Sequence, residues 1–466
     1  MTSSLSAAST DELAPARFPL LKKLAYAAGD FGGNYTWTFV SSFALFYLTT
    51  VVGLAAAMVG TLMLIARLLD GVTDIVIGGL IDKTRSRRGK ARPWLFWSTF
   101  PLAISQIMLF NIPAGLNEFG RYAWFFVVYT LLGAFFYTAS NLAYTTLLSL
   151  VTTDNRTRVS LTSFRVIGAL VAVMILTSTT PSLVEAFGGG QLGWGLVATI
   201  YAGIFVVFTL ITYFAVKELP AEVLAEGIEP PKETAALFWK RFALLLKNHY
   251  FWLLVTFFLV NYVAAGLGQA SSFYYATYVL NDPSAIGLTT IVSLLPMVIL
   301  LPFMPALAAR ISIRWSCVIG GLLGVVGSGI ALANNGSVPI LLIGLAIGAL
   351  GQAPIFAGIY TLVASTAENI HLKSGVRNEG TVFACVTIGV KVGSGVGVAI
   401  AGWMLSAGSF DATAAVQGPA TIAAISAIFL LVPFILSIAK VPLLWAITVE
   451  RANRRLVAAI DGDRER

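Results

Sequence analysis

The sequence predicts an all-α polytopic membrane protein with about twelve transmembrane helices in two six-helix halves. Of its 466 residues, 57% are hydrophobic and only 11% are charged, whereas a soluble domain carries about 25% charged residues. The apolar residues form blocks close to the roughly 20 residues that a bilayer-spanning helix needs. These blocks recur along the whole chain, and lysines and arginines gather in every second connection between them.

The N-terminal half contains six apolar blocks, each long enough to cross a bilayer as a helix. They lie at residues 24–52, 54–81, 93–113, 122–151, 160–182 and 194–216. The preceding segment, 1–23, lacks the charged start, short apolar core and cleavage site of a secretory signal. We therefore expect 24–216 to form one helical bundle, preceded by a cytoplasmic N-terminal segment.

A charged, proline-containing segment at 217–248 is typical of a cytoplasmic linker between two halves. Six more spans follow it, at residues 249–280, 284–308, 315–334, 338–364, 379–406 and 419–446. They predict a second bundle at 249–447 and a cytoplasmic tail at 448–466. Six spans, a loop and six spans is the layout of the major facilitator fold; a channel or a membrane enzyme of similar size is the alternative.

The positions of lysine and arginine predict the orientation. Basic residues concentrate in connections that follow an even number of spans, so the positive-inside rule places both termini in the cytoplasm. These residues are Lys22, Lys23, Lys83, Arg85, Arg87, Arg88, Lys90, Arg92, Arg156, Arg158, Lys240, Arg241, Arg310, Arg314, Lys373 and Arg377. The net charge of +8 thus belongs to short loops, and we expect no nucleic-acid partner. We expect a monomer in the lipid bilayer of the cytoplasmic (inner) membrane.

Motifs for energy-coupled or metal chemistry are missing from the sequence. Gly89-Lys90 is followed by Ala91, not by the serine or threonine of a phosphate-binding loop. No cysteine and histidine cluster has the spacing of a metal site. We therefore expect a transporter without enzymatic activity, cofactor or bound metal, which is passive or driven by an ion gradient.

Helix 54–81 carries the strongest functional signal. Asp70 and Asp74 are four residues apart and share one face of the helix, and Arg67 lies one turn before Asp70 on that face. Two carboxylates this close inside a membrane are costly to ionise together without a cation or a basic partner. The pattern predicts a site for a coupling cation, either a proton or another monovalent cation. The alternative is a structural Arg67–Asp70 ion pair with Asp74 facing a wet cavity.

Other polar side chains also fall inside the apolar spans. Lys391 lies too deep in its span to reach the interface easily, and Arg165 stands in the first turns of span 160–182. Sugar sites combine hydrogen-bonding groups with aromatic rings. The candidates for substrate binding are Asn34, Trp37, Asn141, Tyr144, Arg165, Phe356, Thr387 and Lys391.

Several stretches closely resemble the glycoside-pentoside-hexuronide:cation symporters, the melibiose permease-like family of the major facilitator superfamily. They are LAYAAGDFGGNYTWT at 24–38, the long run from VVGLAAAMVG to RGKARPW at 51–94, YTASNLAYTTLLSLVTTDNRTR at 137–158, FYYATYV at 273–279, GVRNEG at 375–380 and VKVGSG at 390–395. The resemblance covers nearly the whole chain.

The resemblance implies roles for individual residues. Asp70 and Asp74 stand at the positions that bind the coupling cation, and Thr138 matches a threonine of that site. Lys391 matches a functional lysine of the eleventh span, and Arg165 an arginine of the fifth. Asn34 and Asn141 stand where the best-known member of the family has aspartates, the second of them near the cation, whereas members for uronides and xylosides are similar to this chain there. Asparagine can still bond hydroxyls but brings no charge.

The loop after helix 54–81 is a candidate gate. Asp82, Arg85 and Arg88, together with Arg67, are expected to control access. We expect Asp82 and the basic run that follows it to pack under the N-terminal half and close it to the cytoplasm in one state; a purely topological basic loop is the alternative.

A count of buried charges suggests the kind of substrate. Arg67, Arg165 and Lys391 oppose only Asp70 and Asp74 in this count, which leaves one basic residue over. A buried unpaired cation is expensive, so an anionic substrate group would be welcome. The missing carboxylate at Asn141 favours a proton over sodium, because hard cations prefer several oxygen ligands.

Together these observations predict a secondary active transporter. We expect symport of a sugar or glycoside, including a uronide or pentoside, with H+ or Na+ by alternating access. A lipid or amphiphile transporter on the same scaffold is the main alternative, and a sensor or scaffold without transport is a more distant one.

Overall fold

The computed structural model describes residues 18–219, 243–334, 336–376, 379–414 and 416–464, and all regular structure in these ranges is helical. Nine helices of the described ranges are long and apolar enough to cross a membrane. The predicted all-α polytopic membrane fold is confirmed. Most of the linker expected at 217–248, and most of the N-terminal segment, lie outside the described residues.

The first six helical segments follow the six spans predicted for the N-terminal half. They are α1 (Leu20–Phe46) with the π-helical stretch η2 (Tyr47–Val51), α2 (Ala56–Lys83), α3 (Arg92–Leu109), α4 (Glu118–Thr130) continued by η3 (Leu131–Tyr137) and α5 (Thr138–Val151), α6 (Asn155–Ala186) and α7 (Gly190–Ala215).

Six more segments and a tail helix follow the linker. They are α10 (His249–Tyr274) with η4 (Tyr275–Val279), α11 (Ala285–Leu300) with η5 (Leu301–Phe303) and α12 (Met304–Ile311), α13 (Ile313–Leu332), α14 (Val338–Ser374), α15 (Glu379–Ala407), α16 (Pro419–Ser426) with η6 (Ala427–Leu431) and α17 (Val432–Ala446), and the tail helix α18 (Val449–Arg464).

Local chemistry explains several helix ends. The Asp154 carboxylate accepts hydrogen bonds from the backbone N–H groups of Arg156 and Thr157 and so caps α6. The Thr157 hydroxyl and backbone N–H also hold the pKa of this exposed carboxyl below its usual value. Gly375 has φ +71°, the left-handed conformation that commonly ends a helix, and it terminates α14.

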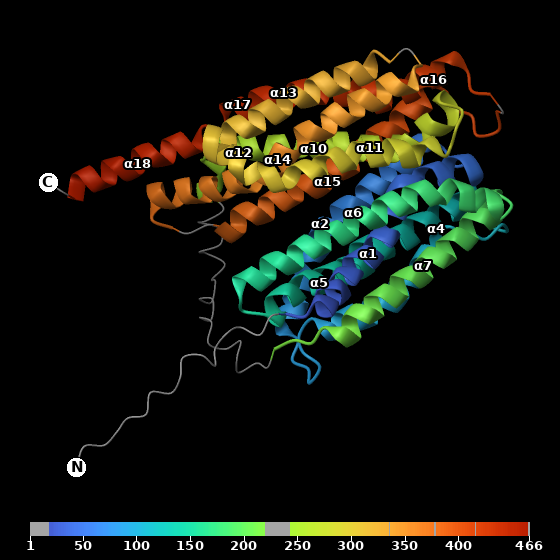
Figure 1. Cartoon of the computed structure of the whole chain (residues 1–466). Coiled ribbons are helices and arrows are strands. Elements are labelled where there is room, and N and C mark those ends of the chain that lie inside the picture. Colours follow the sequence, from blue (N-terminus) through green and yellow to red (C-terminus); the bar gives the residue numbers. More distant parts are fainter. Residues whose placement is uncertain (1–17, 220–242, 335, 377–378, 415, 465–466) are drawn as a thin grey trace.

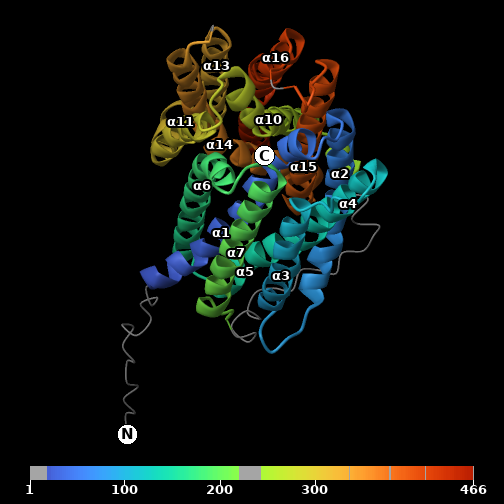
Figure 2. The same cartoon turned by 90° about the vertical axis from the view of Figure 1, so that its right-hand side faces the viewer.

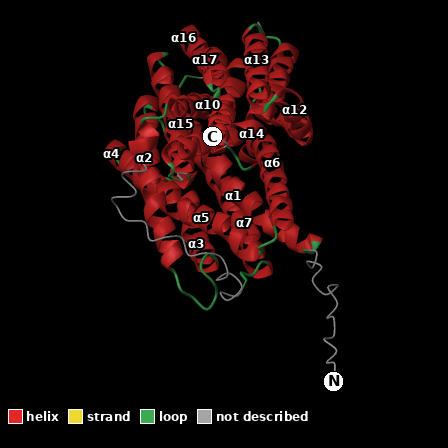
Figure 3. Cartoon of the chain, turned by 90° about the vertical axis from the view of Figure 1, so that its left-hand side faces the viewer, coloured by secondary structure: helices red, strands yellow, loops and turns green. Residues whose placement is uncertain are grey.

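The helices form two groups, α1–α7 and α10–α17, which lie side by side (Figure 1). Figure 2 shows α2 of the first group beside α15 of the second, and Figure 3 shows that helices make up both groups. The tail helix α18 packs against α14, where Asn369 donates a hydrogen bond to Asn453 over 2.8 Å.

Among the described residues, the two groups share an apolar core at one end alone, where α1 is followed by α2. We call this end the closed end. Phe43 and Phe46 of α1 contact the ring of Phe273 of α10 there. Gly402 of α15 lies so close to Ala56 of α2 that a side chain on it would clash. Toward the other end, each group has a separate core of its own.

Candidate functional site

The two aspartates predicted to bind a cation face α15 across the boundary between the groups. The Lys391 ammonium lies 3.0 Å from Asp70 Oδ1 and 2.5 Å from Asp74 Oδ2. The Thr138 hydroxyl of α5 donates a hydrogen bond of 2.6 Å to Asp70 Oδ1. Two carboxylates, one hydroxyl and one ammonium therefore form a single cluster.

Arg67 lies at the edge of this cluster and makes only a loose ion pair with it. Its Nη1 is 3.8 Å from Asp70 Oδ2. The guanidinium instead lies over the ring of Trp37, 3.9 Å from its centroid, and Trp37 stacks on Tyr137. Arg67 is therefore held mainly by aromatic packing, and Lys391 is the closer basic partner of Asp70.

The cluster depends on the close approach of two helices from different groups. Gly395 of α15 lies against Arg67 of α2, and a Cβ there would come within 2.9 Å of the Arg67 side chain. A Cβ at Gly393 would come within 2.8 Å of the Leu259 carbonyl oxygen of α10. The glycines of the VKVGSG stretch thus let α15 bring Lys391 close to the aspartates.

Polar contacts between the two groups lie on one side of the cation cluster. Among the described residues, the ion pairs and hydrogen bonds between the groups extend from the closed end as far as Asp74, and none lies beyond it.

A second charged pair lies within the N-terminal group. Arg165 Nε is 3.3 Å from Asp30 Oδ1, and both side chains are largely buried. The guanidinium also lies over the ring of Tyr144, 4.9 Å from its centroid. Tyr144 stacks on Tyr26 and donates a hydrogen bond of 2.7 Å to its backbone oxygen.

This pair corrects the sequence-based count of buried charges. Asp30 is absent from that count, although it stands in the stretch LAYAAGDFGGNYTWT at 24–38, in α1. Helix α6 begins at Asn155, ten residues before Arg165. Arg165 therefore lies deeper in its helix than the predicted start at residue 160 implied. With Asp30 included, Arg67, Arg165 and Lys391 face three aspartates, so the inferred surplus at these residues is wrong.

The remaining predicted substrate residues do not converge on one site. Asn141 and Tyr144 line a small cavity with Asp30, and the Asn34 side chain donates to the Asp30 backbone oxygen. Tyr144 is 4% exposed, so its ring is already covered by protein. Thr387 bonds the Phe383 carbonyl of its own helix.

Three of the four predicted gate residues are solvent-exposed in this conformation, and the fourth, Arg67, is buried. Asp82 lies in the last turn of α2, and Arg85 and Arg88 lie in the exposed loop that follows; the described residues offer none of the three an ion-pair partner. The far end of this loop is anchored, because the Glu218 carboxylate accepts hydrogen bonds from the backbone N–H groups of Lys90 and Arg92. The gating role of Arg67, Asp82, Arg85 and Arg88 stays a prediction.

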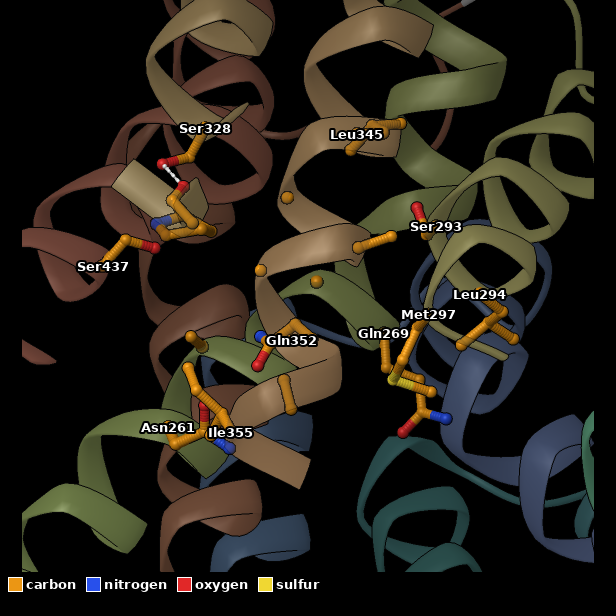
Figure 4. Close-up of a pocket in the computed structure, with 18 of the residues that line it drawn as sticks. Asn261, Gln269, Ser293, Leu294, Met297, Ser328, Leu345, Gln352, Ile355 and Ser437 are labelled. Carbon is orange, nitrogen blue, oxygen red and sulfur yellow. Dashed lines mark hydrogen bonds between the residues drawn. The ribbon is translucent and has the colours of Figure 1, made fainter. Parts of the chain in front are cut away.

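A cavity with a volume of about 560 Å³ lies mainly in the C-terminal group. Figure 4 shows side chains that line it from several helices, including Asn261, Gln352 and Ser437. Phe356, a predicted substrate residue, lies on its wall, and Thr38 and Thr177 reach it from the N-terminal group.

Lys440 of α17 also lines this cavity and was missed by the sequence analysis. It stands near the end of the last apolar span, where a lysine is easily taken for a topological residue. Its burial, at 5% exposure, distinguishes it from such a residue. A lone lysine inside a span was the available signal, as it was for Lys391.

The comparisons with known proteins agree with the fold. A family model described as MFS/sugar transport protein matches residues 25–451. The chain belongs to this family of the major facilitator superfamily, and it is a multi-pass membrane transporter. The resemblance to glycoside-pentoside-hexuronide:cation symporters is thereby confirmed.

Named relatives match over most of their length. The isoprimeverose transporter of Lactiplantibacillus pentosus is 31% identical over 431 residues, which are 90% of this chain and 86% of that protein. The glucuronide carrier protein homolog of Escherichia coli is 27% identical, with 94% of each chain covered. A solved structure of a bacterial homolog of the human lysosomal transporter Spinster has a TM-score of 0.67 at 16% identity, covering 94% of this chain and 97% of that one.

Proposed function

We propose that this protein is a secondary active symporter that couples the movement of a sugar or glycoside to H+ or Na+ by alternating access. The observation that carries the proposal is the Lys391 ammonium between Asp70 and Asp74. Carboxylate oxygens and the Thr138 hydroxyl are the kind of ligands a hard cation prefers. The lysine stands where such a cation would be bound.

Competition between Lys391 and the cation would couple binding to movement. The aspartates belong to α2 of one group and the lysine to α15 of the other, so their ion pairs tie the groups together. A proton or sodium ion at the aspartates takes up one of their two negative charges, the charge that Lys391 otherwise balances, and so displaces the ammonium. The free energy of cation binding then weakens one conformation relative to the other, which is what coupling requires.

The positive-inside rule supplies the orientation of the proposal. The exposed turn with Arg85 and Arg88 would face the cytoplasm, together with both termini, and the closed end would face outward. This conformation is then closed to the outside, as expected for an inward-facing carrier of the inner membrane. We further propose that the protein works as a monomer.

The substrate class rests on named relatives and on the polar groups of the spans. Relatives are named as transporters of isoprimeverose and of glucuronides. Asn34 and Asn141 would bond substrate hydroxyls from the N-terminal group, while Trp37 and Phe356 offer ring faces. Arg165 and Lys391 would orient the substrate or balance its charge, although both have aspartate partners here.

The wall of the large cavity favours a second candidate, transport of a lipid or amphiphile. Leu294, Met297 and Phe356 present apolar surface to this space. An apolar aglycone of a glycoside would use the same surface, so the wall suits both candidates.

Uptake by proteoliposomes tests the proposal. A panel of radiolabelled xylosides, glucosides, glucuronides and a lysophospholipid is offered under an imposed proton gradient, an imposed sodium gradient or no gradient. The proposal expects concentrative uptake of at least one sugar under one gradient. Movement of the lysophospholipid alone would support the second candidate instead.

A further inference from the structure

The cavity of the C-terminal group contains a buried basic residue that the cation site does not use. Lys440 is 5% exposed and projects from α17 into the cavity wall. Its ammonium donates a hydrogen bond of 3.3 Å to Asn261 Oδ1 of α10. An ammonium has three donors, and the described residues provide a partner for only one of them.

No described acidic side chain balances this charge. The acidic residues between α10 and α17 stand in loops or near helix ends: Asp282 and Asp411 in loops, Glu368 in the last two turns of α14 and Glu379 at the start of α15. The other buried bases differ from Lys440, because Arg165 and Lys391 each lie close to an aspartate.

The Lys440 side chain does not extend toward the membrane interface, as lysines near helix ends commonly do. The end of α17 at Ala446 is six residues away, about 9 Å along the helix axis. A lysine at that distance can extend its side chain toward the interface and keep its charge in water. Here the ammonium instead meets Asn261, near the middle of α10, beside the cavity.

Apart from Lys440, the polar side chains that line this cavity are all neutral. Ser437, one turn before Lys440, and Gln352 of α14 line the same cavity (Figure 4). Amide and hydroxyl groups can share in binding an oxyanion but cannot neutralise an ammonium. A buried cation with one amide contact, beside a cavity whose other polar groups are neutral, is completed by an anionic ligand.

We propose that Lys440 and Asn261 form an anion-binding subsite for the carboxylate of an acidic sugar. Asn261 would hold the ammonium in place and also donate its amide N–H to the ligand. The cavity beside it reaches Thr38 of α1 and Thr177 of α6, so a ligand bound here also meets the N-terminal group. The inference rests on the proposed sugar transport for its ligand, but the subsite itself rests on the geometry around Lys440.

Paired ligands test the subsite in the purified full-length protein. Methyl β-D-glucuronide and methyl β-D-glucoside differ in the carboxylate, and binding is measured by calorimetry. Wild-type protein is expected to bind the glucuronide at least tenfold more tightly than the glucoside. Lys440→Met is expected to remove this preference and leave glucoside binding within twofold. Lys440→Arg should keep most of it, and Lys373→Met, at an exposed lysine of α14, should keep all of it.

The methionine variant is expected to fold, because an apolar chain of similar length replaces an unpaired buried charge. An unchanged glucuronide preference in Lys440→Met, or equally tight binding of both sugars by the wild type, would overturn the proposal. A second pair of probes, lysophosphatidylglycerol and lysophosphatidylcholine, separates the two levels of inference. If neither sugar binds but the anionic lipid binds more tightly through Lys440, the subsite stands and the sugar function fails.

Discussion

Replacing Lys391 by methionine removes the ammonium between Asp70 and Asp74 and keeps a side chain of similar length. In the wild-type protein, a coupling cation has to displace this ammonium from both carboxylates. In the variant it meets no such competitor. We therefore expect Lys391→Met to bind the coupling cation more tightly while it loses the ion pairs between α2 and α15.

The magnitude follows from the two contacts, 3.0 Å to Asp70 and 2.5 Å to Asp74. A hydrogen bond to a charged group contributes about 1.5–3 kcal/mol. The Lys391 side chain is 22% exposed, so solvent screens part of this energy. Counting one bond at the lower value, about 1.5 kcal/mol, gives a rise of about tenfold in apparent cation affinity.

Thermal unfolding of the purified protein over a range of sodium concentrations and pH values measures this affinity, because a ligand that binds only the folded state raises the melting temperature. Lys373→Met provides the matched control, since Lys373 is an exposed lysine in the last turn of α14. A cation affinity in Lys391→Met equal to that of the wild type and the control would refute the competition.

Three further changes test other contacts. Asp30→Asn should leave the Arg165 charge without its aspartate and lower stability by about 1–3 kcal/mol; a melting temperature equal to wild type, or no recovery in a double variant with Arg165→Gln, would contradict the pairing. Tyr274→Phe removes the 2.5 Å hydrogen bond to Thr49 at the closed end, worth about 1 kcal/mol, and should shift the population about fivefold toward opening there. Distances between spin labels on the two groups measure that shift, and an unchanged distribution would exclude the bond as a latch. Asp82→Asn should change the balance of the two conformations more than substrate affinity, and wild-type populations in the same spin-label experiment would favour a purely topological loop.

Hydropathy predicted the number and order of the helices better than their ends. It placed the end of the tenth span at residue 364, but α14 continues to Ser374, because a helix does not have to stop where the lipid does. The span expected at 284–308 is interrupted at η5, where Pro302 and Pro305 disturb the backbone hydrogen bonds. The cap at Asp154, a signal present in the sequence, explains why α6 begins before residue 160.

Some features of the candidate site could be predicted from the sequence, and others required the packing of the helices. Asp70 and Asp74 could be found from their spacing on one helix, because helical periodicity is a local property. The Lys391 contact joins residues more than 300 positions apart, and only the packing of α15 on α2 reveals it. Asp30 and Lys440 each stand alone in their spans, so sequence alone did not distinguish a paired charge from one that lines a cavity.

Transport by Asp70→Asn and Asp74→Asn variants in proteoliposomes tests the central claim, that a cation at these aspartates drives substrate accumulation. Each variant is assayed in two ways: uptake driven by an imposed cation gradient, and exchange of labelled for unlabelled substrate without a gradient. We expect gradient-driven accumulation to be abolished in both variants while measurable exchange remains. Accumulation at the wild-type level in both variants would contradict the claim and remove the two aspartates from the coupling site.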